Sequence, residues 1–229
     1  MQIDQSPIQY LFGDLRDDFI SSETSATIQA FLSTENLYIA AAREITTKLE
    51  NLNDEFKITA DRQPIHHIKT RIKTPRSIIE KLIRRGCELN IQSVKEQLDD
   101  IAGVRVICSY IDDIYTLADL LVNQNDIELL RTRDYIKNPK PNGYRSLHLV
   151  VMVPVFLSKN TERVKVEVQI RTIAMDFWAS LEHELAYKLD DKKSQTIITE
   201  LKECADIIAQ TDVRMQKLQK ALYQASGDG

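Results

Sequence analysis

Apolar residues recur every three or four positions in some parts of the chain and every second position in others. The two spacings together predict a mixture of helices and strands. From about residue 6 to residue 52, apolar residues recur every three or four positions, which is typical of amphipathic helices. The same spacing returns over most of residues 194–225. Residues 51–67 are polar and include Pro64, so we expect a connector there. Both ends of the chain are therefore predicted to be helical.

The central part of the chain has sharper boundaries. Thr74 and Pro75 are an N-cap residue and a first-turn proline, and a glycine ends the run, so a helix is predicted over residues 75–85. After it come a strand within GVRVICSY, a helix capped by Asp112, and two strands, LHLVVMVPVF and VKVEVQIRT. A further amphipathic helix follows Thr172. Strands interleaved with helices, with one direct strand-to-strand step, predict an α+β fold in which helices pack against a mixed sheet.

Length and composition fit one folded domain. The chain has 229 residues, of which 43% are hydrophobic and 28% charged, as in an ordinary globular protein. We expect a single domain over residues 1–229, made of N-terminal helices (1–67), a core that carries the chemistry (68–190) and a C-terminal helix (191–229). Because no apolar run approaches roughly 18 residues and the N-terminus is acidic, we expect a cytoplasmic protein without a membrane partner. The three widely spaced cysteines fit neither a disulfide framework nor a zinc site.

The charge balance limits the possible partners. The formal net charge is −4, whereas non-specific nucleic-acid binders are usually basic, so we expect no DNA partner. Positive charge is instead concentrated in two stretches. Residues 71–85 carry six basic residues and one acid, and residues 131–145 carry five basic residues and one acid. Any phosphate-binding site should lie in these stretches.

The helix that begins at Pro75 has a cationic side and an apolar side. At about 100° per residue, Ser77, Lys81 and Arg84 fall on one stripe. The opposite side carries Ile78, Ile79, Leu82 and Ile83. Upstream, Arg71 and Lys73 alternate as on an extended segment, so a polyphosphate would fit between them and the helix N-terminus. The alternative interpretation is a solvated basic helix face, which is common.

Two carboxylates are candidates for metal binding or for proton transfer. Glu167 lies on the polar face of the strand VKVEVQIRT, with Gln169 and Arg171, and a carboxylate within a sheet needs a metal, a cation or solvent nearby. Asp100 precedes a strand in which Gly103 allows close backbone approach. Since Mg²⁺ takes one or two protein carboxylates beside substrate phosphates, the two acids would suffice. The alternatives are a solvent-facing strand for Glu167 and a turn or cap for Asp100.

A basic loop and the helix after Thr172 offer a second binding region. The segment RTRDYIKNPKPNGYRSLH combines cations with Tyr144, and such a pair can hold a nucleotide by charge and by base stacking. Asp176, Ser180, His183 and Tyr187 share one face of the following helix, opposite Trp178, Leu181 and Leu185. A carboxylate such as Asp176 can accept from both N–H groups of a guanine edge. Tyr144 could equally be a half-buried tyrosine, and the helix face could be solvated.

Five motifs, in order, resemble the synthetase domain of the RelA/SpoT homolog family, and most of all its small alarmone synthetases. They are TRIKTPRSIIEKLIRRG, DDIAGVRVIC, RDYIKNPKPNGYRSLHLVV, VEVQIRT and MDFWASLEHELAYK, and they span about residues 71–188. The resemblance implies a nucleotidyltransferase-like core that transfers pyrophosphate from ATP to the 3′-hydroxyl of GDP or GTP. It also implies a Mg²⁺ cofactor and a homotetramer formed through the terminal helices.

The resemblance further implies roles for individual residues. For ATP, it implies an adenine sandwich and phosphate contacts from Arg71, Arg105, Lys73, Ser77, Lys81 and Arg84. For Mg²⁺, it implies Asp100 as a ligand and Glu167 as a ligand that also accepts the proton of the 3′-hydroxyl. For the acceptor nucleotide, it implies stacking on Tyr144 and contacts from Arg133, Lys140, Arg145, His148, Gln169 and Asp176.

Long members of that family also carry a hydrolase domain with a His-Asp dipeptide. Here none of the four histidines precedes an aspartate, so we expect no hydrolase activity. Three alternatives to a synthetase are a pyrophosphokinase that modifies the 3′ end of tRNA, a regulator that binds nucleotides without catalysis, and a single-stranded RNA-binding module that uses the basic loop. The carboxylates discriminate against the pure binder, because they repel phosphates unless a metal intervenes.

Overall fold

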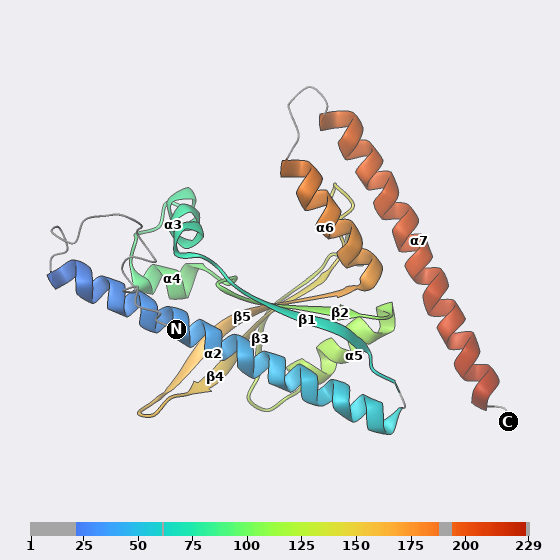
Figure 1. The fold of residues 1–229 in the computed structure, drawn as a ribbon, viewed down its shortest axis with the longest axis horizontal. Coiled ribbons are helices and arrows are strands. Elements are labelled where there is room, and N and C mark those ends of the chain that lie inside the picture. Colours follow the sequence, from blue (N-terminus) through green and yellow to red (C-terminus); the bar gives the residue numbers. More distant parts are fainter. Residues whose placement is uncertain (1–21, 61, 188–193, 228–229) are drawn as a thin grey trace, which may run out of the picture.

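The computed structural model describes residues 22–60, 62–187 and 194–227, and its centre is a twisted five-stranded sheet (Figure 1). The strands are β1 (Ile65–Ile72), β2 (Ala102–Cys108), β3 (Glu128–Asp134), β4 (Leu147–Phe156) and β5 (Thr161–Thr172). The helices are α2 (Ser22–Thr59), α3 (Pro75–Arg84), α4 (Ile91–Gln97), α5 (Ile111–Val122), α6 (Ile173–Tyr187) and α7 (Ser194–Gly227). The strand order is β1-β2-β5-β4-β3, in which β2 and β5 are parallel and the other neighbours antiparallel. The predicted α+β fold with a mixed sheet is confirmed.

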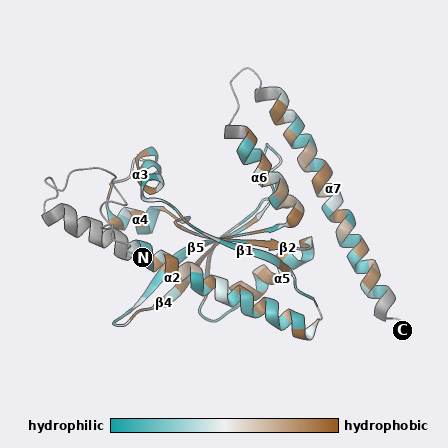
Figure 2. Cartoon of the chain, in the orientation of Figure 1, coloured by the Kyte–Doolittle hydropathy of each residue, from teal (hydrophilic) through white to brown (hydrophobic). Residues whose placement is uncertain are grey.

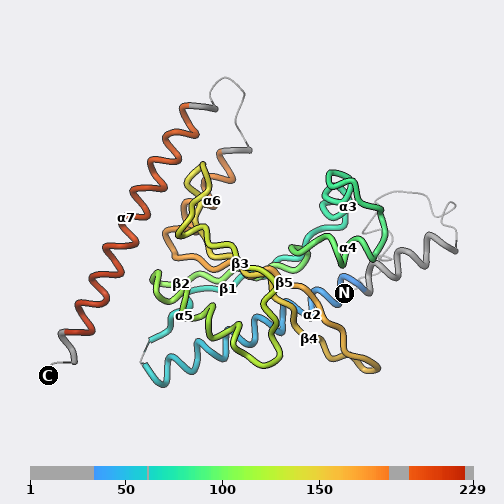
Figure 3. The backbone as a smooth tube through the Cα atoms, turned by 180° about the vertical axis from the view of Figure 1, so that it is seen from behind, coloured from blue at the N-terminus to red at the C-terminus, as the bar shows by residue number. Residues whose placement is uncertain are grey.

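Strand β5 separates an apolar face of the sheet from a polar one. Its residues Val164, Val166, Val168 and Ile170 are all buried. They belong to one hydrophobic cluster with Ile45 and Leu49 of α2 and Ile114 and Leu117 of α5. Figures 1 and 3 show α2 and α5 on this side of the sheet, and α3 and α6 on the other side, toward its two ends. The polar residues of β5 therefore face the space between α3 and α6.

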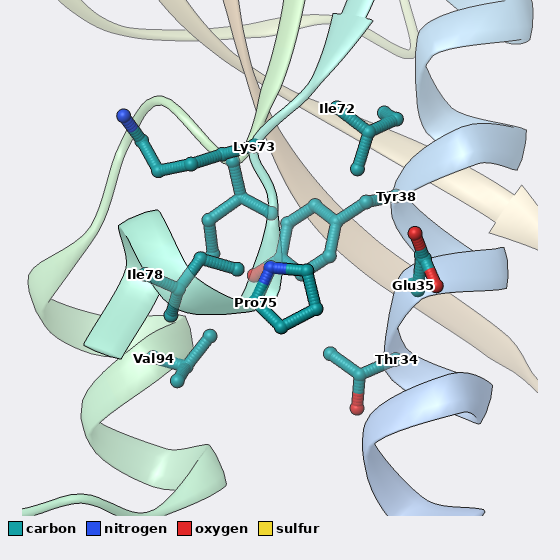
Figure 4. Close-up of a pocket in the computed structure, with 9 residues that line it drawn as sticks. Thr34, Glu35, Tyr38, Ile72, Lys73, Pro75, Ile78 and Val94 are labelled. Carbon is teal, nitrogen blue, oxygen red and sulfur yellow. The ribbon is translucent and has the colours of Figure 1, made fainter. Parts of the chain in front are cut away.

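Helix α3 follows the predicted capping pattern. The side chain of Thr74 accepts a hydrogen bond from the backbone N–H of Ser77, and Pro75 opens the helix. The predicted apolar side is only half right, because Ile78 and Leu82 are buried whereas Ile79 and Ile83 are 41% and 61% exposed. The buried side of α3 is therefore narrow. There Ile78 lines a small cavity together with Tyr38 of α2 (Figure 4). The same view shows the ammonium group of Lys73 directed away from this apolar contact.

Several sequence predictions are wrong at the edges of the sheet. Of the expected connector over residues 51–67, residues 51–59 belong to α2 and residues 65–67 to β1. Arg131 and Arg133 lie on β3 and not in a loop. Strands β1 and β3 are the two edge strands of the sheet and most of their residues are exposed, so they lack the apolar alternation that reveals a strand.

The helix predictions also differ from the structure at several points. The short helix α4 was not predicted, and α5 begins at Ile111, with Asp112 in its first turn instead of at the cap. The predicted helix over residues 6–21 lies outside the described residues.

The C-terminal helix α7 packs lengthwise against α6, and hydrophobic residues recur along both (Figure 2). The indole N–H of Trp178 donates to the backbone carbonyl of Leu201 at 2.8 Å, which ties the two helices together. Trp178 is buried as predicted, but Leu181 and Leu185 on the same side of α6 are each more than 40% exposed. In the part of the chain that the structure describes, no helix is long and apolar enough to cross a membrane.

Candidate active site

The strand register places the residues of this face in two adjacent rows across the sheet, and most of them are polar. One row consists of Lys69, Arg105, Gln169, His148 and Arg133, one from each strand. The next row consists of Arg71, Gly103, Glu167, Val150 and Arg131. Paired residues of neighbouring strands point to the same face, so each row ends in cations at both edges of the sheet. Gly103, which has no side chain, lies between Arg71 and Glu167 in this row and lines the larger cavity described below.

Two cavities open on this face, and they share two carboxylates. The larger cavity, of about 450 Å³, is lined by Lys69, Thr70, Arg71, Lys73, Asp100, Gly103, Val104, Arg105, Glu167 and Gln169. The smaller cavity, of about 80 Å³, is lined by Lys81, Arg85, Asp99, Asp100, Arg131, Arg133, His148, Val150 and Glu167. Asp100 and Glu167 line both. A ligand in one cavity would therefore meet a ligand in the other at these two acids.

Asp100 is held by two lysines through one of its oxygens. Its Oδ2 lies 2.7 Å from Nζ of Lys81 and 3.0 Å from Nζ of Lys73. Burial acts to raise the pKa of this carboxyl, but the two lysines outweigh burial and lower it, so Asp100 is ionised at neutral pH. The other oxygen, Oδ1, is buried and has no hydrogen-bond partner among the described residues. A buried carboxylate oxygen without a partner needs a ligand such as a cation.

Glu167 is also ionised, and it is held by two side chains from the polar face of the sheet. Its Oε1 lies 3.2 Å from Nδ1 of His148, and its Oε2 accepts from the amide of Gln169 at 2.9 Å. Burial acts to raise the pKa of Glu167 and the nearby Asp100 adds to this, but the hydrogen bonds lower the pKa overall. The side chain is therefore a carboxylate that can accept a proton or bind a cation at neutral pH.

The two carboxylates fit a magnesium site completed by a phosphate ligand. Among the described residues no group of three or more His, Cys, Asp or Glu side chains could hold a metal by itself. Mg²⁺ commonly takes only one or two carboxylates and fills the remaining positions with phosphate oxygens and water. The unpartnered Oδ1 of Asp100, beside the cation-lined cavities, meets that requirement.

Tyr144 lies next to Glu167 in a network of side chains. Its hydroxyl is 2.8 Å from Nε2 of His148, whose other ring nitrogen contacts Glu167. The hydroxyl also accepts a 2.5 Å hydrogen bond from Nη2 of Arg171. The ammonium group of Lys140 lies 4.6 Å from the centre of the Tyr144 ring. The aromatic ring is thus fixed at its polar end and flanked by cations, and its predicted stacking role stays a prediction.

Asp176 bridges two arginines that come from different strands. Its Oδ1 accepts from Arg171 at 3.2 Å and from Arg105 at 3.4 Å. Arg105 lines the larger cavity, whereas Arg171 contacts Tyr144, so Asp176 connects the two parts of the site. Arg171 is only 4% exposed and is a site residue that the sequence prediction left without a role. The alternation of β5 had placed it on the polar face, and that was the available indication.

Six of the predicted site residues line neither cavity, namely Ser77, Arg84, Lys140, Tyr144, Arg145 and Asp176. Ser77 is 2.9 Å from the hydroxyl of Thr74 and takes part in the cap of α3. Neither Ser77 nor Arg84 lines the larger or the smaller cavity. Arg145 turns toward α7, where it contacts Asp206 at 3.1 Å. The predicted roles of all the site residues in nucleotide and metal binding stay predictions.

The fold and the site together define a class, namely proteins that hold polyphosphate ligands on the open face of a mixed sheet, around two carboxylates. Comparisons with known proteins narrow this class. The family model described as a region found in RelA / SpoT proteins matches residues 70–192. The chain therefore belongs to the RelA/SpoT family, and the resemblance noted in the sequence is confirmed.

Individual relatives support the same assignment. The chain is 46% identical over 184 residues to GTP pyrophosphokinase YwaC of Bacillus subtilis. The aligned region covers 80% of this chain and 88% of that protein. Its fold matches the crystal structure of small alarmone synthetase 2 from Bacillus subtilis with a TM-score of 0.73 and 44% identity, over 82% of this chain and 97% of that one. It matches small alarmone synthetase 1 from Bacillus subtilis, bound to its product pppGpp, with a TM-score of 0.76 and 32% identity, over 85% and 99% of the two chains.

Proposed function

We propose that this protein transfers a pyrophosphoryl group from ATP to the 3′-hydroxyl of GDP or GTP and releases AMP. The observation that carries the proposal is that Asp100 and Glu167 form a wall common to two cation-lined cavities. A reaction between two nucleotides needs such a meeting point, whereas a protein that binds one nucleotide does not. A relative named GTP pyrophosphokinase and a similar structure that holds pppGpp support the same reaction.

ATP occupies the larger cavity in this proposal. Arg71 and Arg105 come from neighbouring strands and line it, so their guanidinium planes can enclose the adenine. Lys73 just before α3 and Lys81 in its last turn both contact Asp100, and from there they face the polyphosphate. Ser77 in the first turn of the same helix and Arg84 in its last turn serve the outer phosphates. Mg²⁺ bound by Asp100 and Glu167 would neutralise charge on the transferred phosphates.

GDP or GTP occupies the region of Tyr144 and the smaller cavity. The base stacks on Tyr144, an interaction worth about 1–3 kcal/mol. Arg133 and His148 line the smaller cavity, and Lys140 lies above the tyrosine ring. Gln169 and Asp176 lie within the hydrogen-bonded network around Arg171. Arg145 belongs to the same loop as Tyr144.

The chemistry requires one proton transfer and one in-line displacement. Glu167 accepts the proton of the 3′-hydroxyl, whose oxygen forms a bond to the β-phosphorus of ATP. The bond between that phosphorus and the oxygen bridging to the α-phosphorus breaks, and AMP leaves with the bridging oxygen. Phosphoryl transfers of this kind depend mainly on positioning and charge stabilisation. The lysines at Asp100 and the arginines at both edges of the sheet supply that charge.

The proposal extends to assembly and location. A homotetramer formed through the terminal helices would cover Val213, Leu218 and Leu222 of α7, which are exposed in the single chain. The absence of a membrane-spanning helix among the described residues is compatible with a cytoplasmic location. Light scattering on the purified protein measures the number of subunits directly.

The test of the function is a chromatographic assay with Mg²⁺, ATP and either GDP or GTP. We expect AMP and a guanosine tetra- or pentaphosphate in equal amounts, and the ratio of the two rates ranks the acceptors. If ATP binds but neither product forms, the protein is not a synthetase. Labelled phosphate recovered on added tRNA would then indicate the tRNA-modifying alternative.

A further inference from the structure

The loop that carries Tyr144 is attached to the C-terminal helix by Arg145. Its guanidinium group donates to the backbone carbonyl of Ala205 at 3.2 Å and to the carboxylate of Asp206 at 3.1 Å, both on α7. It also donates to the carbonyl of Gly143, within its own loop, at 3.1 Å. The side chain of Arg145 is 16% exposed, so most of its hydrogen-bonding capacity is used inside the protein.

The backbone of the loop lies directly against α7. Gly143 has φ +91°, and a Cβ atom added there would be 2.6 Å from Cβ of Ala205. Any other residue would therefore be strained and would also collide with the helix. Tyr144 packs against the buried cluster of Trp178, Ala179 and Ala205. The position of the loop is thus determined by contact with α7 as well as by its own turn.

The loop is also closed internally and tied to α6. The N–H of Gly143 donates to the carbonyl of Lys140 at 2.8 Å, and the N–H of Lys140 donates to the carbonyl of Tyr144 at 3.2 Å. The side chain of Asn142 donates to Glu182 of α6 at 3.1 Å. A closed turn moves as a unit, so a change at its attachment to α7 displaces Tyr144 and Lys140 together.

We propose that Asp206 is a positioning residue for acceptor binding, which acts by holding Arg145 and, through it, the loop that presents Tyr144. Asp206 lies on α7 and lines neither of the two active-site cavities. Its other partner is Lys202, one turn earlier on α7, at 2.9 Å. The inference rests on the proposed function only for the identity of the acceptor.

The first measurement is steady-state kinetics of Asp206→Ala. We expect the KM for GDP or GTP to rise roughly three- to ten-fold, as for loss of a partly exposed charge-assisted pair. The KM for ATP and the kcat at saturating acceptor should stay within about two-fold, a division that a general loss of folding would not produce. Asp206→Asn, which keeps an oxygen for Arg145 but loses the charge, should give an intermediate KM.

Matched variants separate this role from direct nucleotide binding by Arg145. If Arg145 acts through Asp206, Arg145→Ala and the double variant with Asp206→Ala should raise the acceptor KM by about the same factor as Asp206→Ala alone. Lys202→Ala removes the other partner of Asp206, and Glu203→Ala removes an exposed acid next to it on the helix, so both should leave the acceptor KM unchanged. An unchanged acceptor KM in Asp206→Ala would overturn the proposal.

Hydrogen–deuterium exchange without nucleotide tests the attachment independently of turnover. In Asp206→Ala, the amides of Lys140, Gly143 and Tyr144 should exchange faster than in the wild type, whereas those of β5 should not change. Unchanged exchange in this loop contradicts the proposal even if the protein is a synthetase. If instead the wild type yields no guanosine product, the proposed function fails, and loop exchange together with the calorimetric affinity for GDP still decides the role of Asp206.

Discussion

Arg171 donates a 2.5 Å hydrogen bond from its Nη2 to the hydroxyl of Tyr144. The guanidinium carbon of the same arginine lies 5.0 Å from the centre of the tyrosine ring. Because Arg171 is almost fully buried and also binds Asp176, it cannot move without disturbing the rest of the site. The orientation of the ring is therefore set before any nucleotide binds.

This relationship separates the ring of Tyr144 from its hydroxyl. Tyr144→Ala removes the stacking surface, and we expect the acceptor KM to rise on the order of ten-fold or more, in line with about 1–3 kcal/mol per stacked base. Tyr144→Phe keeps the ring but loses the contacts with Arg171 and His148. It should raise the acceptor KM only about two- to five-fold. Steady-state kinetics with varied GDP distinguish the two, and equal effects would mean that the hydroxyl, not stacking, dominates.

Glu167→Gln tests the assigned proton acceptor. The substitution keeps the size of the side chain and its contact with His148 but removes the basic oxygen, so kcat should fall roughly 10²- to 10⁴-fold. ATP affinity, measured by calorimetry, should change little in comparison. Glu162→Gln is the matched control, since Glu162 lies on the same strand beyond both cavities and pairs with Asn160 and Lys95. Turnover by Glu167→Gln at the wild-type rate would show that another group accepts the proton.

The alternation of β5 was sufficient to predict which of its residues form the core and which lie on the polar face of the sheet. Val166 and Glu167 differ by one position, and the two-residue period alone assigns them to opposite faces. The cap of α3 was equally local, because Thr74 and Pro75 define its start. These predictions succeeded since each depends on residues that are close in sequence.

The partners of the charged residues could not be predicted in this way. Arg145 and Asp206 are 61 residues apart, and Arg105 and Asp176 are 71 apart. Nothing in the local pattern indicates that an arginine will be bound by a distant helix instead of a nucleotide. The prediction of the edge strands β1 and β3 failed for a related reason. Most of their residues face solvent, so their sequences lack the apolar alternation of a buried strand. Which distant side chains pair, and which strands lie at the exposed edges of the sheet, is decided only when the chain folds.

Asp100→Asn tests the proposed cation ligand. The amide lacks the charge that both Lys73 and Lys81 neutralise, and it offers a weaker oxygen to a metal. We expect the Mg²⁺ concentration for half-maximal rate to rise at least about ten-fold, with a lower maximal rate. Asp99→Asn is the neighbouring control, since Asp99 is occupied by Arg131 and Lys165. Its Mg²⁺ dependence should match the wild type, and an equal shift in both variants would indicate a general effect of charge.

Asp212 provides a test of stability that is separate from catalysis. This aspartate of α7 is 7% exposed, and its Oδ2 accepts a 2.6 Å hydrogen bond from the hydroxyl of Thr172. Burial raises the pKa of Asp212, and the Thr172 hydrogen bond and the charge of Arg145 offset this only in part. The folded protein therefore holds the proton of Asp212 more tightly than the unfolded chain does.

The direction of the pH effect follows from that raised pKa. The stabilising contribution of protonated Asp212 is complete below the unfolded pKa of 3.8 and is lost as the pH rises through the higher pKa of the folded state. Asp212→Asn cannot ionise and can still accept from Thr172, so its melting temperature at pH 7.5 should exceed that of the wild type by about 2–4 °C, corresponding to roughly 1 kcal/mol. Near pH 4 the difference should shrink or reverse. Glu203→Gln, an exposed acid on the same helix, should match the wild type at both values. A lower melting temperature for Asp212→Asn at pH 7.5 would mean that the attraction between ionised Asp212 and Arg145 outweighs the cost of burying the charge.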